Sequence, residues 1–372
     1  MVKIGVLTSS RADFGVYLPL LKAFLKDTDI DFEIIAFGTH LSNLHGYTIV
    51  EIKENGFDVK HAISCMLADD SEVAIATSAA LTSMKFAEFW ANHKNEYDIV
   101  LCLGDRFEMF SAVIAGVPYG VKFAHLYGGD YSKGAIDNVY RDGMTHASIM
   151  HFTSNQKCAE RVLALTGSKD RIEVIGILSL DELEKTHLLT IEEFRSKWKI
   201  DLSKQTLLIS FHPETVNADK NIAYARIVKT VLEELYNQYQ LVITMPNADT
   251  NGSIFRKEFE LLKAANPKNV FLIENFGNQS YFTCMKHSLL LLGNSSSGIS
   301  EAASFNKYFI NIGERQTGRV LGKNIISVPF SPELILNKTK ATLELGEFKG
   351  ENIYKSEGAV NHIISKLKSI SI

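Results

Sequence analysis

Cysteine is scarce in this chain, with four residues among 372. The four are far apart and form no C-x-x-C pair, which excludes the spacing of a cysteine zinc site and of a disulfide framework. They lie mostly in or beside apolar runs, so we expect reduced thiols in a core, a cytoplasmic protein and no metal site. These residues are Cys65, Cys102, Cys158 and Cys284.

Long apolar runs and an excess of basic charge are also missing. No stretch approaches the ~18 apolar residues that span a membrane, and the run before Leu7 is too short for a signal peptide and contains Lys3. The chain has 39 basic and 43 acidic residues, and its basic residues form only scattered pairs. We therefore expect a protein that binds neither membranes nor nucleic acid.

What the sequence does contain is an alternation of short apolar runs with helical patterns. This alternation predicts an α/β fold of parallel sheets with right-handed crossovers, and the length suggests two domains. We expect Rossmann-like domains at residues 1–178 and 179–355, and a final helix in 356–372 that returns to the first domain. The predicted strands are Val2–Leu7, Phe32–Phe37, Asp98–Leu103, Val121–Leu126, Ile149–Thr153, Arg171–Ile175, Thr206–Phe211, Leu241–Met245, Val270–Ile273, Leu289–Leu292 and Tyr308–Ile312.

Polar residues follow these strands directly. In open α/β sheets, ligands bind outside the carboxyl ends of the strands. A single polar residue at such a position is usually a helix cap or a loop residue, whereas ten equivalent ones favour a ligand site. The ten are Arg11, His40, Asp105, Arg106, Asp130, Asp137, His212, Asn247, Ser295 and Arg315.

The most informative stretch is Leu289–Arg319, which reads as a strand, a small-residue loop and a helix. The loop Ser295–Gly298 offers backbone N–H groups and hydroxyls at a helix start, which favours an anion such as a phosphate. We expect Glu301 in the first turns of that helix, near the sugar hydroxyls. Arg315 and Arg319 can direct guanidinium groups at the same phosphates. The alternative is a Ser-capped helix followed by a solvated Arg loop.

Together these segments resemble the hydrolysing UDP-N-acetylglucosamine 2-epimerases over essentially the whole chain. The resemblance implies two Rossmann-type domains of the glycosyltransferase-B type, with the active site in the cleft between them. The segments that carry it are Ser10–Asp13, Gly38–His40, Gly104–Glu108, His125–Asp130, Gly134–Asp137, Phe211–Thr215, Pro246–Thr250, Gly293–Gly298 and Ile312–Arg319.

The reaction that the resemblance implies is an elimination followed by a hydration. A base removes the C2 proton while UDP leaves C1, which gives a glycal, and water then adds with inversion at C2 to release N-acetylmannosamine. No cofactor is needed. Carboxylates can act as the base only if their pKa values are tuned by the site, and the leaving diphosphate needs stabilised charge.

The resemblance also implies roles for individual residues. Asp105, Asp137 and His212 match positions implicated in catalysis. We expect Asp105 to take part in the C2 proton transfer and His212 to contact or protonate the leaving phosphate. The remaining expected substrate-binding residues are Arg11, His40, Arg106, Arg141, Asn247, Phe276 through its backbone, Ser295, Ser296, Glu301, Arg315 and Arg319.

Two positions depart from the family pattern. Tyr127 stands where many relatives carry Glu and some carry His, and Asp142 stands where relatives usually carry His. Asp130 occupies the place of the family's following Glu, so we include it among the catalytic carboxylates. The sequence leaves open which carboxylate is the C2 base, whether the nucleotide is UDP or GDP, and whether the sugar is N,N'-diacetylbacillosamine instead.

Two further classes of function remain open from the sequence alone. A glycosyltransferase on the same scaffold would move the sugar to an acceptor, and a sugar-nucleotide sensor would bind it without turnover. The three rim carboxylates Asp105, Asp130 and Asp137 favour proton transfer over a sensor. Relatives self-associate, so we also expect a homo-oligomer, either a dimer or a tetramer.

Overall fold

The computed structural model describes residues 1–43, 47–67, 69, 71–131, 136–181, 183, 187–214, 218–246, 252–274 and 276–370. The chain divides into two compact units, each of which is built on one sheet. The first unit contains Met1–Tyr131, Ile136–Glu182 and Ser356–Ile372, and the second contains Leu183–Lys355. All the strand pairs among the described residues are parallel, which confirms the predicted α/β fold.

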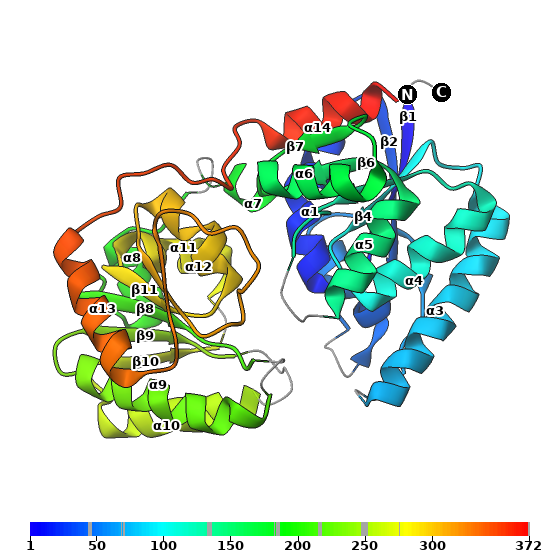
Figure 1. Ribbon diagram of the computed structural model, residues 1–372. Helices are drawn as coiled ribbons and strands as arrows, with labels where there is room; N and C mark the ends of the chain where they lie inside the picture. Colours follow the sequence, from blue (N-terminus) through cyan, green and yellow to red (C-terminus); the bar gives the residue numbers. More distant parts are fainter. Residues whose placement is uncertain are drawn as a thin grey trace. The chain divides into compact units, whose positions relative to one another are not determined.

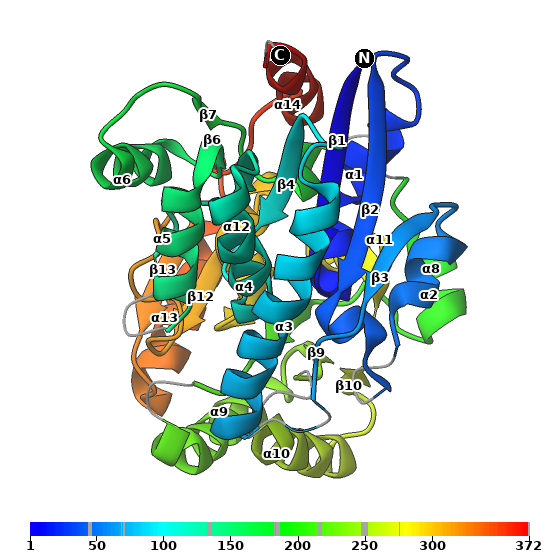
Figure 2. The same cartoon turned by 90° about the vertical axis from the view of Figure 1, so that its right-hand side faces the viewer.

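The sheet of the first unit has seven strands in the order β3-β2-β1-β4-β5-β6-β7. Its central strands β1 and β4 are almost entirely buried because helices cover both faces, as parallel sheets require. In Figure 2, β2 lies between β1 and β3. The strands are β1 (Val2–Thr8), β2 (Ile30–Phe37), β3 (Val59–Ile63), β4 (Ile99–Leu103), β5 (Phe123–Leu126), β6 (Ser148–Thr153) and β7 (Ile172–Val174).

The helices of the first unit include the last one of the chain. Helix α14 packs on α1 and α7, and its Ile363 and Leu367 are fully buried in the same core as Leu20 of α1 (Figure 1). The helices are α1 (Arg11–Phe24), α2 (Ile49–Glu54), α3 (Glu72–His93), α4 (Phe107–Gly116), α5 (Asp137–Ala147), α6 (Gln156–Thr166), α7 (Leu178–Asp181) and α14 (Ala359–Lys368).

The second unit has six strands in the order β10-β9-β8-β11-β12-β13. Helices α9 and α10 pack side by side (Figure 1) and join α13 over one apolar core. The strands are β8 (Thr206–Ser210), β9 (Gln240–Thr244), β10 (Val270–Ile273), β11 (Leu290–Gly293), β12 (Phe309–Ile312) and β13 (Ile325–Val328). The helices are α8 (Ile191–Trp198), α9 (Asn221–Leu235), α10 (Gly252–Ala265), α11 (Gly277–His287), α12 (Ser296–Ser300) and α13 (Pro332–Leu345).

Three details of the fold differ from the sequence-based expectations. The edge strands β3 and β13 were not predicted, because β3 has Lys60 and His61 within its five residues and β13 is a short run that contains Ser327. The charged, helical pattern of Leu183–Lys199 predicts a helix there, but α8 begins only at Ile191, where Thr190 and Glu193 form a capping box. Glu301 is not in the first turns of a long helix, because α12 ends at Ser300.

Two expectations about composition can be compared with the structure. All four cysteines are free and buried, as predicted for core thiols. Burial raises the pKa of Cys102 to about 12, so this thiol stays protonated and inert at neutral pH. Among the described residues, no helix is long and apolar enough to cross a membrane.

Gly293 at the end of β11 is required by the close approach of β8. Its φ is +149°, and a Cβ atom there would collide with the backbone oxygen of Ser210. The two strands are hydrogen-bonded at this point, since Gly293 pairs with Ser210. Glycine therefore allows both strands to reach the same edge of the sheet.

We predict that Gly293→Ala lowers the free energy of unfolding by at least about 3 kcal/mol, because an unfavourable φ adds to a backbone collision. Gly120→Ala is the matched control, since Gly120 also has a positive φ (+69°) but open space around it. The control should cost about 1–2 kcal/mol. Urea denaturation measures both values, and equal losses would contradict the role of the strand contact.

Candidate active site

Asp105 follows β4 and is held by a buried arginine from α5. Arg141 is 3% exposed, and its guanidinium donates to the Asp105 carboxylate, to the backbone oxygen of Asp130 at 2.9 Å and to Oδ1 of Asn138 at 3.1 Å. A charge-assisted bond from a buried arginine fixes the orientation of a carboxylate. The structure thus brings together three of the predicted site residues, and Arg141 positions the other two.

Asp137 is the first residue of α5 and belongs to the same cluster. The residue is solvent-exposed, yet partial desolvation of its carboxyl group and the negative charge of Asp105 raise its pKa above the ordinary value. Arg141 and Arg106 oppose this shift. A carboxyl with a raised pKa is better matched to proton exchange near neutral pH than an ordinary aspartate.

Arg106 forms an ion pair with a fully buried carboxylate. Its Nε and Nη2 atoms donate to Oε1 of Glu108 at 3.2 and 2.7 Å. Burying an unpaired carboxylate would be costly, so this pair compensates the charge of Glu108 through Oε1 and orients the guanidinium. Oε2 of Glu108 is buried without a hydrogen-bond partner among the described residues. Glu108 was not predicted as a site residue, although it lies within the Gly104–Glu108 segment.

His125 supports the turn that carries Asp105 and was also missed. It is fully buried between the backbone oxygen of Gly104, 2.9 Å from Nε2, and the hydroxyl of Thr145, 3.2 Å from Nδ1. A carbonyl only accepts, so Nε2 carries the proton and Nδ1 accepts from Thr145. Burial lowers the pKa of His125 to about 3, and the imidazole is therefore neutral at physiological pH.

His40 and Arg11 follow β2 and β1 at the same edge. His40 is fully buried, with Nε2 2.9 Å from the Thr8 hydroxyl and Nδ1 2.9 Å from the Thr48 hydroxyl. Burial lowers its pKa, so His40 is a neutral group held inside the fold. Arg11 is exposed at the start of α1, and its Nη1 lies 3.8 Å from Oε1 of Glu51.

The two positions that depart from the family pattern have structural partners. The Tyr127 hydroxyl accepts a hydrogen bond from the backbone N–H of Leu178 at 2.9 Å. Asp142 forms a two-pronged ion pair with Arg161, at 2.7 and 2.6 Å, and Arg161 lies over the ring of Tyr131. These contacts explain how the fold accommodates both residues.

In the second unit, Asn294 connects the ends of β8 and β11. Its side chain accepts from the backbone N–H of His212 and donates to the His212 carbonyl, both at 2.8 Å. Its own carbonyl accepts from Nη1 of Arg315 at 3.1 Å and from Gln316 at 2.8 Å. Asn294 is fully buried, so it joins two predicted site residues, His212 and Arg315, through short bonds.

The serine loop follows Asn294 directly. Ser295 is the N-cap of α12 and accepts from the N–H of Ser297 at 3.3 Å, while Ser296 is exposed. The Ser297 hydroxyl donates to the carboxylate of Glu301, which follows the helix. Because α12 has only five residues, an anion here would be held by N–H and hydroxyl groups more than by a helix dipole.

The remaining predicted site residues of the second unit differ in their surroundings. Phe276 precedes α11 and packs its buried ring against Trp198 and Phe194, at 4.8 and 5.6 Å between centroids, so only its backbone could meet a ligand. Arg319 is half-buried in the loop after β12. Asn247 lies outside the described residues.

A family model and curated relatives match most of this chain. The family model described as UDP-N-acetylglucosamine 2-epimerase matches residues 22–368. A UDP-N,N'-diacetylbacillosamine 2-epimerase (hydrolyzing) of Legionella pneumophila subsp. pneumophila is 30% identical over 371 residues, which is 100% of this chain and 96% of the relative. A GDP/UDP-N,N'-diacetylbacillosamine 2-epimerase (hydrolyzing) of Campylobacter jejuni subsp. jejuni is 33% identical over 349 residues, 93% of this chain and 88% of the relative.

The fold has close counterparts among solved structures. The UDP-GlcNAc 2-epimerase of Neisseria meningitidis, solved with bound UDP-GlcNAc, superposes with a TM-score of 0.80 over 98% of this chain and 99% of that chain, at 16% identity. The family match covers most of the sequence, and the fold and the relatives agree with it. The chain therefore belongs to the UDP-N-acetylglucosamine 2-epimerase family.

Proposed function

We propose that the protein is a hydrolysing 2-epimerase that converts UDP-N-acetylglucosamine and water into N-acetylmannosamine and UDP. The observation that carries this proposal is the carboxylate pair of the first unit. Asp105 is bound by the buried Arg141, and Asp137 has a raised pKa beside it. Two carboxyl groups with different environments are the arrangement that separates acid from base roles.

Asp105 and Asp137 are assigned successive proton transfers in this scheme. Asp105 takes the C2 proton, the C1–O bond breaks, and UDP leaves with the bonding electrons, which gives a 1,2-unsaturated sugar. Water then adds its hydroxyl to C1, while C2 receives a proton on the opposite face. Asp137 supplies that proton, since a raised pKa favours a protonated carboxyl that can donate.

The diphosphate is assigned to the serine loop and arginine of the second unit. Arg315 is anchored to the carbonyl of Asn294, next to the N–H groups of Ser295 and Ser296. Fixed donors around a leaving group stabilise the charge as it develops. His212, held by the same Asn294, is assigned to the leaving phosphate.

A second candidate substrate follows from the relatives. The two relatives at 30% and 33% identity are named for UDP- and GDP/UDP-N,N'-diacetylbacillosamine. That sugar would react by the same steps at C1 and C2, since the difference lies at other ring positions. A glycosyltransferase reaction is the third possibility, and it would require an acceptor.

We also propose that the protein is cytoplasmic and forms a homo-oligomer. The free, buried cysteines support the cytoplasmic location, because thiols stay reduced in that compartment.

Incubation of the purified protein with UDP-N-acetylglucosamine in D2O tests the reaction. We expect UDP and free N-acetylmannosamine that carries deuterium at C2, because the proton added during hydration comes from solvent-exchanged groups. NMR of the products measures both. A parallel sample with UDP-N,N'-diacetylbacillosamine identifies the preferred sugar. Turnover only with an added acceptor, or binding of both nucleotides without UDP release, would refute the proposal.

Asp105→Asn and Arg315→Ala should separate chemistry from binding. Asp105→Asn should abolish turnover and leave UDP affinity within about tenfold (~1.4 kcal/mol), because the diphosphate is assigned to the other unit. Arg315→Ala should weaken UDP binding instead. Calorimetric titration with UDP and a coupled UDP-release assay give the two readouts. Equal losses of UDP affinity in both variants would overturn the assignment of roles.

A further inference from the structure

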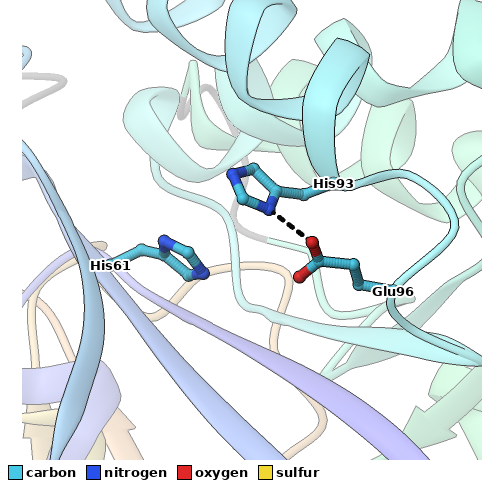
Figure 3. A group of neighbouring side chains, drawn as sticks. All are labelled: His61, His93 and Glu96. Carbon is cyan, nitrogen blue, oxygen red and sulfur yellow. Dashed lines mark hydrogen bonds and ion pairs between the residues drawn. The ribbon is translucent and has the colours of Figure 1, made fainter.

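Two histidines and a glutamate meet on the first unit, away from the rim described above. His61 lies on the edge strand β3, His93 is the last residue of α3, and Glu96 follows three residues later (Figure 3). One ligand atom from each lies within 4.8 Å of the other two. Glu96 precedes β4, whereas Asp105 follows it, so the cluster is at the amino end of that strand and separate from the carboxylate site.

The ring nitrogens of this cluster are only partly used by the fold. Nδ1 of His93 lies 3.0 Å from Oε1 of Glu96. Nε2 of His61 is buried and makes no hydrogen bond to any described residue. A buried polar atom without a partner is costly, and a bound ion is one of the ways in which it is satisfied.

The aromatic packing around the cluster orients the two imidazoles. Phe89 stacks on His93 with 4.5 Å between ring centroids and meets His61 edge-on at 4.9 Å. The imidazole centroids are 4.7 Å apart. Packing alone would explain the ring positions, but it does not use Nε2 of His61 or require a carboxylate beside the pair. A metal ion would use the nitrogens and the carboxylate together.

The adjacent carboxylate Glu33 adds negative charge without being free to bind. Its Oε2 lies 3.9 Å from Nε2 of His61 and accepts a hydrogen bond from the Tyr97 hydroxyl at 2.8 Å, while Oε1 lies 3.1 Å from Nζ of Lys3. Glu33 can therefore favour a cation electrostatically without coordinating it.

We propose that His61, His93 and Glu96 bind a divalent transition-metal ion of the zinc class. Two imidazoles and one carboxylate are a donor set that suits Zn²⁺, and hard cations such as Mg²⁺ prefer oxygen donors alone. Zn–ligand bonds near 2.1 Å in a tetrahedron place ligands about 3.4 Å apart. The cluster must therefore contract slightly, and the Glu96 side chain, 41% exposed, is able to move. Water would complete the coordination.

Such an ion would have a structural role. It would connect the edge strand β3 to the end of α3, two segments that are 32 positions apart in the chain (93 − 61). Edge strands have one unpaired side, and an added cross-link limits their opening. The site takes no part in the proposed epimerase reaction, so the two proposals can fail independently.

Zinc binding by the full-length protein tests the site. The metal-free protein should take up one Zn²⁺ per chain in competition with a chromophoric chelator, and Co²⁺ should give a tetrahedral absorption band. Mg²⁺ should not compete. Saturating Zn²⁺ should raise the melting temperature by about 5 °C, since an ion that binds only the folded state stabilises it.

His61→Gln and His93→Gln should each lower zinc affinity by at least about 100-fold, more than the loss of an outer partner usually costs. His187→Gln is the matched control, because it removes an exposed histidine of the second unit. Circular dichroism and UDP titration establish that each variant is folded, and Glu96→Gln provides a third, milder change. Binding that is unaffected by the His61 and His93 substitutions, or no stoichiometric binding, would overturn the proposal.

Discussion

The parallel direction of every described strand pair is the constraint on which the site depends. Parallel strands place their carboxyl ends at one edge of a sheet, so residues that are far apart in the chain reach the same rim. In the first unit this edge collects Arg11, His40 and Asp105, and in the second it collects His212 and Ser295. The strand order alone therefore brings the site residues of each unit to one edge of its sheet, and side-chain contacts then orient them.

Buried polar residues then hold the site residues at these strand ends in place. Arg141 binds Asp105, Glu108 binds Arg106, and Asn294 joins His212 to Arg315. Each of these contacts pairs a group that would be costly to bury alone, and each sets the direction of a side chain that we assign to the substrate. The same bonds that stabilise the rim therefore preorganise it.

The sequence predicted the sheets well, because long apolar strands alternating with helices admit few other folds. It missed β3 and β13, whose short or mixed patterns reflect their edge positions. It also missed Asn294 and His125, since a polar residue that serves the fold has the same local pattern as one that serves a ligand. Only their burial and partners in space distinguish these two classes.

The two positions that depart from the family pattern affect which residues of this chain can carry the proton transfers. Tyr127 uses its hydroxyl to accept from Leu178, and Asp142 is paired with Arg161. Both side chains therefore have partners within the fold. In the proposed mechanism the proton transfers therefore fall to Asp105 and Asp137, with Asp130 beside them through its carbonyl contact to Arg141. Desolvation and, after it, the negative charge of Asp105 raise the pKa of Asp137, so removing the Asp105 charge would also change the group assigned to the second proton transfer.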